Sequence, residues 1–270
     1  MGLLMKLRTV LSILAISILV VPLSAHPSNP IQDSNRAQAV ALWEEVIKAK
    51  GGRGRLHAIK NLLIVSKVKV DARRQVDLME TRRLYVLPDR AWLQATTPAL
   101  GFSIEARVSS IEDGICRVTV SPKHANVRSV SPCLLTEWGT HLMQDPIVYL
   151  LETQWLQPKL TGTRVEEISN KRVDVIEAEI NGMRVDFYLD GKTRLPFKLV
   201  TNQANGVAQS TRHVVLTVKL EDYANVAGIQ MPRKIIRESA ARPSMVSRSI
   251  EQAEYSFDVE YKKSLFDEPA

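Results

Sequence analysis

The sequence predicts an α+β fold, in which a meander of antiparallel β-strands is covered on one side by helices. Between Val185 and Ile236, apolar and polar residues alternate in short segments separated by turn signals such as Asp190-Gly191, which is typical of strands with one apolar face. From Val40 to Ile47, and again from Leu134 to Leu156, apolar residues recur at helical spacing instead. An apolar sheet face must be buried, and the two helical stretches are the candidates to cover it.

The first 25 residues have the features of a signal peptide. Lys6 and Arg8 form a basic region, Val10 to Val21 an apolar run, and Leu23-Ser24-Ala25 a cleavage site of small residues. The apolar run of twelve residues is shorter than the ~20 residues that span a membrane. We therefore expect cleavage and export to a bacterial periplasm; an uncleaved membrane anchor is the alternative.

After the signal, residues 26–33 are rich in Pro, Asn and Ser, and we expect them to form a flexible leader. Asp33 or Ser34 can cap the first helix, and Gly51-Gly52 can end it. The chain from 34 to 270 contains no internal repeat and no low-complexity tract. These residues are therefore expected to form a single domain.

Period-two alternation predicts further strands along the chain. Asn181-Gly182 is the strongest signal for a two-residue hairpin, and Asp145-Pro146 marks the start of a helix with proline in its first turn. Pro122 to Pro132 and Ala240 to Val246 are expected to be irregular. The predicted strands outside the central meander are Leu62–Val70, Val76–Leu87, Ala91–Ala95, Phe102–Ser110, Ile115–Ser121, Arg172–Ile180 and Ser249–Tyr261.

Four arginines lie in and before the second predicted strand: Arg73, Arg74, Arg82 and Arg83. They could form a binding patch. A solvated outer face of the sheet is the better interpretation, because charged and apolar positions are interleaved there as a half-buried strand requires.

The charge balance argues against nucleic acid as a partner. The signal carries two of the 36 basic residues and none of the 29 acidic ones, so the remaining chain has a net charge of +5. That excess is compatible with solubility and with some attraction to anionic lipid headgroups. It is far below the positive charge that is typical of nucleic-acid-binding proteins. The chain after the signal is long enough to bury a hydrophobic core without needing disulfide bonds or metal ions for stability.

The two cysteines of the sequence, Cys116 and Cys133, both follow the signal. In an oxidising compartment an even pair indicates a disulfide bond, and two buried free thiols are the alternative. The sequence has no Cys-x-x-Cys and no paired histidine spacing, so a metal site is not expected.

Motifs for catalysis are absent. There is no Gly-rich phosphate loop, no nucleophile elbow and no His-Glu-x-x-His. The histidines of the sequence are scattered among different predicted elements. We therefore expect a protein that is not an enzyme and needs no cofactor; a hydrolase with an unrecognised Ser/His/Asp set is the least favoured alternative.

Large apolar residues fall on predicted inward faces or on amphipathic helices. The simpler interpretation is an ordinary core. The alternative is that a curved sheet and its helices leave an apolar cavity, which would bind apolar ligands. The candidate cavity residues are Trp43, Ile47, Trp92, Phe102, Trp138, Trp155, Phe187, Phe197 and Phe257.

Three stretches carry a resemblance to a known family. They are AVALWEEVIKAKGGRGRLHAIKNL from Ala39, FYLDGKTRLPFKLV from Phe187 and LEDYANVAGIQMPRKI from Leu220. With the signal segment, the N-terminal helix, the meander and the helical insert, they resemble the outer-membrane lipoprotein carrier superfamily, which includes LolA-like and LolB-like proteins and related sensor domains.

The resemblance implies an open half-barrel of antiparallel strands closed by helices over a hydrophobic cavity. It also implies lipids or lipoprotein acyl chains as partners, in transport or sorting to the outer membrane. The leading hypothesis is therefore an exported, non-enzymatic lipid-binding protein. The alternative is an envelope-stress sensor or assembly scaffold that binds an inner- or outer-membrane protein through its sheet.

Overall fold

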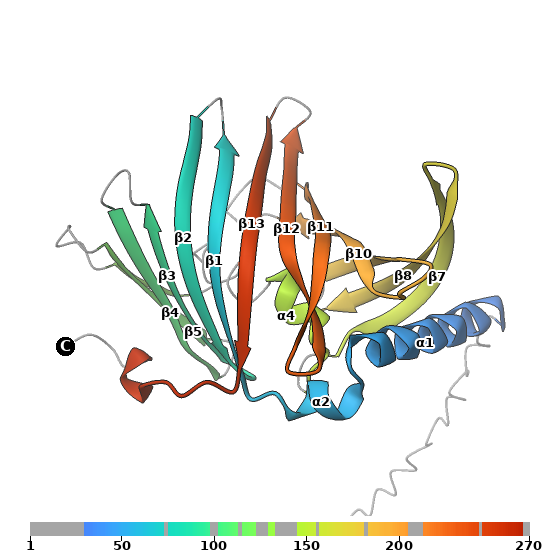
Figure 1. The fold of residues 1–270 in the computed structure, drawn as a ribbon, viewed down its shortest axis with the longest axis horizontal. Coiled ribbons are helices and arrows are strands. Elements are labelled where there is room, and N and C mark those ends of the chain that lie inside the picture. The colour runs from blue at the N-terminus through green and yellow to red at the C-terminus, as the bar shows by residue number, and fades with distance from the viewer. Residues whose placement is uncertain are drawn as a thin grey trace, which may run out of the picture.

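A computed structural model of the chain describes residues 30–72, 75–97, 102–112, 115–122, 129–132, 145–154, 157–180, 183–204, 213–242 and 245–266. Within these residues, thirteen antiparallel strands form one sheet in the order β6-β5-β4-β3-β2-β1-β13-β12-β11-β10-β9-β8-β7 (Figure 1). The signal peptide predicted at 1–25 and Cys133 of the predicted disulfide lie outside the described residues.

The strands fall into two groups along the chain. The first group consists of β1 (Asn61–Ala72), β2 (Gln75–Val86), β3 (Arg90–Thr97), β4 (Phe102–Glu112), β5 (Ile115–Pro122) and β6 (Ser129–Pro132). The second consists of β7 (Lys159–Ile168), β8 (Lys171–Ile180), β9 (Met183–Leu189), β10 (Pro196–Ala204), β11 (His213–Val226), β12 (Ile229–Arg242) and β13 (Met245–Phe257).

The two groups meet at one pair of strands. The first strand, β1, pairs with the last, β13, from Leu62 opposite Phe257 to Asp71 opposite Arg248. On either side of this seam each strand pairs with its neighbour in the chain. The sheet is therefore two meanders joined by a pairing between residues almost two hundred positions apart.

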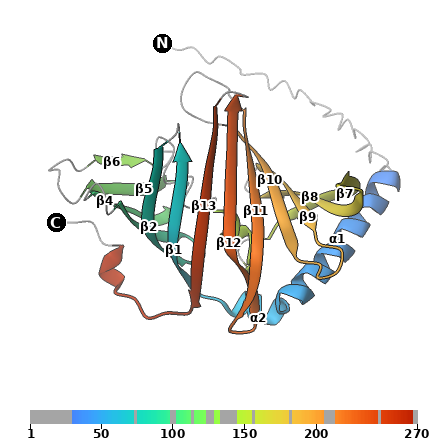
Figure 2. The same ribbon diagram turned by 45° about the horizontal axis from the view of Figure 1, so that its top comes forward.

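Helices pack on one side of the sheet, which we call the inner face. They are α1 (Pro30–Lys50), α2 (Arg53–Ala58) and the short α4 (Pro146–Leu150), which lies within the curve of the sheet (Figures 1 and 2). Successive strand residues point to opposite sides of a sheet. Accordingly Leu62, Ile64 and Phe187 are buried with Trp43 of α1 in one large cluster. None of the helices in the described part of the chain is long and apolar enough to cross a membrane.

The other side of the sheet is the outer face. Here Leu84 and Val86 of β2 are covered by Phe266, which follows the short 3-10 helix η3 (Lys263–Leu265) near the end of the chain. A second small cluster, of Val173, Val175 and Tyr188, lies on β8 and β9. The outer face is thus only locally apolar.

Most elements agree with the sequence prediction. The alternating segments form strands, α1 ends at Gly51-Gly52, and α4 begins after Asp145 with Pro146 in its first turn. The strands flanking Asn181-Gly182 pair up to Ile180 opposite Met183, as a two-residue hairpin requires. The helical stretch predicted from Leu134 to Leu156 is confirmed only for α4, which ends at Leu150; residues 151–154 are turn or irregular, so the predicted end was wrong. Residues 133–144 and 155–156 are outside the described residues.

Several boundaries were predicted wrongly. Helix α1 begins at Pro30, inside the predicted flexible leader, because the fixed φ of proline suits a first helical turn. The predicted loop from Ala240 to Val246 is mostly strand, because β12 and β13 pair as far as Arg242 opposite Met245. Strand β13 stops at Phe257, before the predicted end, because Asp258 has a φ of 51°. Strands β6 and β7 were not predicted.

Two glycines join the helices to the sheet. Gly51 has a φ of 130°, and a Cβ atom there would collide with the carbonyl oxygen of Gly228. Gly228 lies in the two-residue turn between β11 and β12, where Val226 pairs with Ile229. The end of α1 therefore approaches this hairpin more closely than any residue with a side chain would allow.

We expect Gly51→Ala to lower the free energy of unfolding by about 3 kcal/mol, because it combines a positive φ with a steric clash. The measurement is urea unfolding followed by circular dichroism. The control is Gly54→Ala in α2, where an added Cβ meets nothing within 4 Å. Alanine there should leave stability unchanged or raise it by up to about 1 kcal/mol. Equal losses from both substitutions would contradict this account of Gly51.

Candidate ligand-binding face

The inner face carries the largest apolar surface that the fold brings together. Trp43 of α1 packs against Phe187 of β9 in a tilted arrangement with ring centroids 5.0 Å apart, and Ile47 packs into the same cluster. Strands from both meanders contribute to this cluster, for example Ile64 of β1 and Ile235 of β12. The inner face is therefore the side of the sheet on which apolar side chains are removed from water.

Helix α4 lies across this surface. Ile147, Val148, Tyr149, Leu150 and Leu151 are each at most 2% exposed. Five consecutive buried residues mean that apolar side chains leave α4 in every direction, as in a helix enclosed on all sides. We call residues 145–152 the α4 strap, because buried charged groups hold both of its ends.

The first end of the strap is held by a buried ion network. Asp145 caps α4 by accepting a hydrogen bond from the backbone N–H of Ile147 at 3.0 Å. The same carboxylate forms ion pairs with Arg83 of β2 and with Arg237 of β12, the latter at 3.3 Å. Glu251 of β13 pairs with both arginines. Two cations and two anions thus balance each other on the inner face, where an unpaired charge would be costly.

Neighbouring hydroxyls complete this network. The hydroxyl of Tyr85 donates to Asp145 at 3.0 Å, and Ser66 and Thr81 share a hydrogen bond of 2.6 Å beside it. Burial opposes the ionisation of Glu251, but attraction to Arg237 and Arg83 outweighs it and lowers the pKa of Glu251 to about 2. Glu251 is therefore charged at neutral pH and can pair with both arginines.

The second end of the strap lies in another buried polar cluster. Glu152, which has a φ of 43°, pairs with Arg53 of α2. Burial raises the pKa of Glu152, although Arg53 opposes this shift. The indole N–H of Trp43 lies near the same carboxylate, outside ordinary hydrogen-bond geometry. The strap thus ends beside the junction of α1 and α2.

Lys50, the last residue of α1, is buried in this second cluster. Its Nζ has no hydrogen-bond partner among the described residues. Burial lowers the pKa of Lys50 to about 7, although Glu152 acts in the opposite direction. A buried amine without a close partner is destabilising in its charged form, so Lys50 weakens the fold at and below neutral pH.

Solved structures share this architecture. A LolA superfamily protein from Nitrosomonas europaea is 15% identical, with a TM-score of 0.56 over 85% of this chain and 97% of the other. The chain has a LolA-like fold. A DUF1329 family protein from Desulfovibrio piger (11% identical, TM-score 0.55) is matched over 88% of this chain and 97% of its own.

A third match is a domain assigned to outer membrane lipoprotein sorting, from Vibrio parahaemolyticus. It is 10% identical, with a TM-score of 0.53 over 86% of this chain and 97% of that domain. Neither a protein-family model nor a curated protein sequence matches the chain. The likeness that the sequence suggested is therefore confirmed at the level of the fold.

The LolA-like fold brings together only some of the residues expected to line a cavity. Trp43, Ile47 and Phe187 lie in the inner-face cluster, and Phe257 packs against it. Trp92 lies on the outer face beside Leu84, where its indole donates to Glu105 at 2.6 Å. Phe197 also lies on the outer face, near Tyr188 at a centroid distance of 6.4 Å.

Three other candidates cannot be placed against this face. Trp138 and Trp155 lie outside the described residues, as does the side chain of Phe102, although β4 itself is described. The predicted disulfide between Cys116 and Cys133 also involves a residue outside the described ones, because residue 133 is not described.

One expectation about the arginines was wrong. Arg82 is exposed on the outer face as predicted, but Arg83 is buried on the inner face. Adjacent strand residues point to opposite sides of a sheet, so only one of the two could be solvated. Arg73 and Arg74 lie outside the described residues.

The sequence does contain signals for these buried charges. Lys50 follows Trp43 and Ile47 by seven and three positions, which places it on the apolar side of α1. Glu251 shares its strand parity with Ala253 and Tyr255, which are buried. Within the described residues, no group of three His, Cys, Asp or Glu side chains is placed to hold a metal ion.

Removing one anion from the first network should be costly. We expect Glu251→Gln to lower the free energy of unfolding by about 3 kcal/mol or more, because Arg83 and Arg237 lose a buried partner. The measurement is urea unfolding at pH 7. The control is Glu221→Gln on the exposed pair with Lys234, 2.7 Å apart, which should cost less than about 1 kcal/mol.

The acid range gives a second check on Glu251. Its pKa is depressed in the folded protein, so its stabilisation is complete above the ordinary value of 4.5 and is lost as the pH falls towards about 2. The wild type should therefore lose more stability than Glu251→Gln between pH 4.5 and pH 2. Parallel pH profiles for the two proteins would contradict the assignment.

The buried amine should respond in the opposite pH range. The unfolded chain keeps a proton on Lys50 up to its ordinary pKa of 10.5, whereas the folded protein releases it near pH 7. Wild-type stability should therefore rise between pH 7 and pH 9, by up to about 1.4 kcal/mol per pH unit from this group. We expect Lys50→Met to remove this rise and to stabilise the protein at pH 7.

Thermal unfolding between pH 7 and pH 9 measures both effects of Lys50→Met. The control is Lys48→Met, because Lys48 is exposed on the same helical turn. A surface substitution of this kind should change stability by less than about 0.5 kcal/mol and leave the pH profile unaltered. A destabilised Lys50→Met variant would mean that the amine has a partner that supports the fold.

Proposed function

We propose that the protein is an exported, non-enzymatic binding protein that holds a lipid or a lipoprotein acyl chain on its inner face. The single observation that carries the proposal is the α4 strap, an apolar helical turn whose residues 147–151 are buried in the inner-face cluster. An acyl chain has the same requirement as these buried side chains, since it needs apolar contact and no hydrogen bonds. The strap marks the place that such a chain would take or share.

Two further features support a role in transport or sorting to the outer membrane. The fold is shared with a domain assigned to outer membrane lipoprotein sorting. The sequence pattern of residues 1–25 fits export, and we propose a periplasmic location. In that compartment we expect Cys116 and Cys133 to form a disulfide, and residues 34–270 to act as one lipid-binding domain.

The buried ion network suggests how entry could be controlled. Asp145 ties the first end of the strap to β2 and β12, so a ligand that enters the apolar cluster must move a segment held by charges. Ion pairs of this kind depend on all their members. Loosening one end of the strap should therefore admit an apolar ligand more readily while the sheet remains intact.

The second candidate function is an envelope-stress sensor or an assembly scaffold with a protein partner. The observation that favours it is again the strap, because in the described residues it fills the inner face with the protein's own side chains. A solid inner face would leave the sheet to act as a rigid platform. The two candidates differ in whether purified protein carries lipid.

The first experiment is native mass spectrometry of the protein purified from an envelope fraction, followed by extraction and identification of bound molecules. A reproducible acylated species would support the lipid-binding proposal and identify the ligand. A bare protein mass, together with no uptake of a fluorescent fatty acid, would overturn it in favour of a protein partner.

We expect Asp145→Asn to increase the rate of fluorescent fatty-acid uptake by about tenfold, because the loss of its buried ion pairs with Arg83 and Arg237 costs more than the ~1.4 kcal/mol that such a change requires. Asparagine is also a good N-cap, so α4 keeps its cap and loses only the charge. Glu221→Gln serves as the matched control and should leave the rate unchanged. An unchanged rate in Asp145→Asn would mean that the strap does not control entry.

A further inference from the structure

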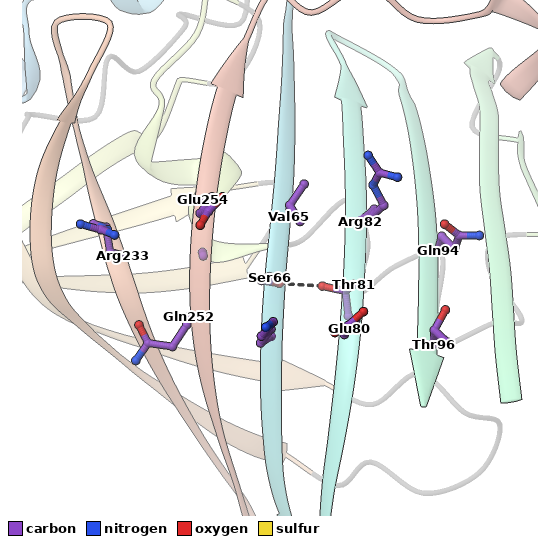
Figure 3. A pocket seen from close by; sticks show the side chains of 12 residues that line it. Val65, Ser66, Glu80, Thr81, Arg82, Gln94, Thr96, Arg233, Gln252 and Glu254 are labelled. Atoms are coloured by element: carbon purple, nitrogen blue, oxygen red, sulfur yellow. Dashed lines mark hydrogen bonds between the residues drawn. The ribbon is translucent and has the colours of Figure 1, made fainter. Parts of the chain in front are cut away.

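A pocket of about 620 Å³ lies on the outer face, on the opposite side of the sheet from the α4 strap. Strands β1, β2, β3, β12 and β13 carry its lining (Figure 3). Its size falls within the range of small-molecule sites, roughly 300–1,000 Å³. The lining consists of Val65, Ser66, Lys67, Glu80, Thr81, Arg82, Gln94, Thr96, Arg233, Gln252, Ala253 and Glu254.

The strand register arranges the side chains of this pocket in two rows across four strands. One row runs Glu254, Val65, Arg82 and Gln94, from β13 through β1 and β2 to β3. The next row runs Gln252, Lys67, Glu80 and Thr96 over the same strands. Within each row the side chains are neighbours on one side of the sheet, and the charges alternate in sign.

The floor of the pocket is the sheet itself. The side chains of Ser66, Thr81 and Ala253 are buried on the inner face, so only their backbone can reach the outer side. Strands β1, β2 and β13 are each paired on both edges. A ligand therefore has no free strand edge to join and must be recognised by the side chains above the floor.

The charged groups of the pocket lack partners among the described residues. Lys67, Glu80, Arg82, Arg233 and Glu254 form no ion pair or side-chain hydrogen bond in the described part of the chain. Even Lys67 and Glu80, which are opposite each other in the register, are not paired. Five charged groups in one concave area are thus available to a ligand.

The outer face of β7, β8 and β9, the other wing of the sheet, differs from the pocket in how its charged residues are paired. On β7, β8 and β9, Arg164 pairs with Glu177 at 2.7 Å and with Asp186 at 2.8 Å, and Arg184 pairs with the same two carboxylates. The positive and negative side chains there neutralise each other by forming ion pairs. Charged residues on the outer face of this sheet can thus pair with one another, and those of the pocket differ in remaining unpaired within the described residues.

The pattern of charge indicates the kind of ligand. Glu254 and Arg82 flank Val65 in one row, about 10 Å apart at the backbone, and Val65 is 38% exposed between them. A carboxylate on one side, an apolar contact in the middle and a guanidinium on the other side complement an amine, a short carbon linker and an anion. Guanidinium groups favour phosphate, which they can bind through two hydrogen bonds.

The net charge of the lining points the same way. Three cations and two carboxylates give the pocket a charge of +1. A phosphate monoester carries about −1.5 to −2 near pH 7, so with one ammonium group such a ligand has a net charge of about −0.5 to −1. We propose that the pocket binds an aminoalkyl phosphate, with its amine on Glu254 and its phosphate on Arg82 and neighbouring cations. The site is separate from the acyl-chain site proposed for the inner face.

The test uses the full mature protein and isothermal titration calorimetry with O-phosphoethanolamine, ethanolamine and inorganic phosphate. O-phosphoethanolamine should bind more tightly than either part alone. We expect Arg82→Gln to weaken its binding by at least about tenfold, because a charge-assisted hydrogen bond is lost. Glu254→Gln should reduce the affinity for O-phosphoethanolamine to that for inorganic phosphate.

The matched control is Lys69→Gln. Lys69 is exposed on the same side of β1, two residues beyond Lys67, and is not part of the lining. It should leave the affinity within about twofold of the wild type, since it removes the same charge outside the site. Circular dichroism of each variant checks that the sheet is intact.

A second set of measurements distinguishes the source of the ligand. Vesicles of phosphatidylcholine with and without phosphatidylethanolamine are tested by flotation beside the free compound. Binding to the ethanolamine-containing vesicles that Arg82→Gln abolishes would assign the site to lipid headgroups, and binding only to the free compound would assign it to a soluble metabolite. Both results support the proposal.

Three results would overturn it: no binding of any probe, equal affinity for inorganic phosphate and O-phosphoethanolamine, or affinity that Arg82→Gln leaves unchanged. None of them bears on the inner face. Conversely, Arg82→Gln should leave fatty-acid uptake unaltered, so failure of one site can be told from failure of the other.

Discussion

The placement of the α4 strap depends on the buried ion network of Arg83, Asp145, Arg237 and Glu251. These residues come from β2, the start of the strap, β12 and β13, so one interaction connects the first meander, the second meander and the segment between them. Desolvating four charges is expensive unless each is paired. The network therefore permits one arrangement of these elements, and it gives an otherwise apolar interface a fixed position.

The two faces of the sheet use charge in opposite ways. On the inner face, the charges of the ion network are buried and paired with one another, and they fix the position of apolar groups. On the outer face they are numerous and exposed. There, one wing pairs its charges internally while the pocket over β1, β2 and β13 leaves them free. A single sheet can thus present an apolar surface and a polar one, because alternate residues of each strand face opposite ways.

The sequence predicted the parts of the fold that depend on local pattern. Alternation located most strands, Gly51-Gly52 the end of α1, and Asp145-Pro146 the start of α4. Strand β7 was missed because it is an edge strand whose charged residues hide the alternation. The candidate site was harder to predict. Arg83 and Glu251 are 168 positions apart, and only the β1–β13 seam brings them together. Trp92 and Phe197 were assigned to the wrong face because an aromatic residue alone does not reveal which side of a strand is covered.

The seam between β1 and β13 also governs when the structure can form. Strand β1 emerges early in synthesis, but its second partner is the last strand of the chain. Until that strand arrives, β1 has an open backbone edge, which is the kind of surface that recruits foreign strands. Contacts between residues so far apart in the sequence also form slowly during folding, because a long loop must close before they are made. A chain interrupted before residue 245 would therefore be left as two unjoined meanders, with the ion network incomplete and apolar inner surfaces uncovered.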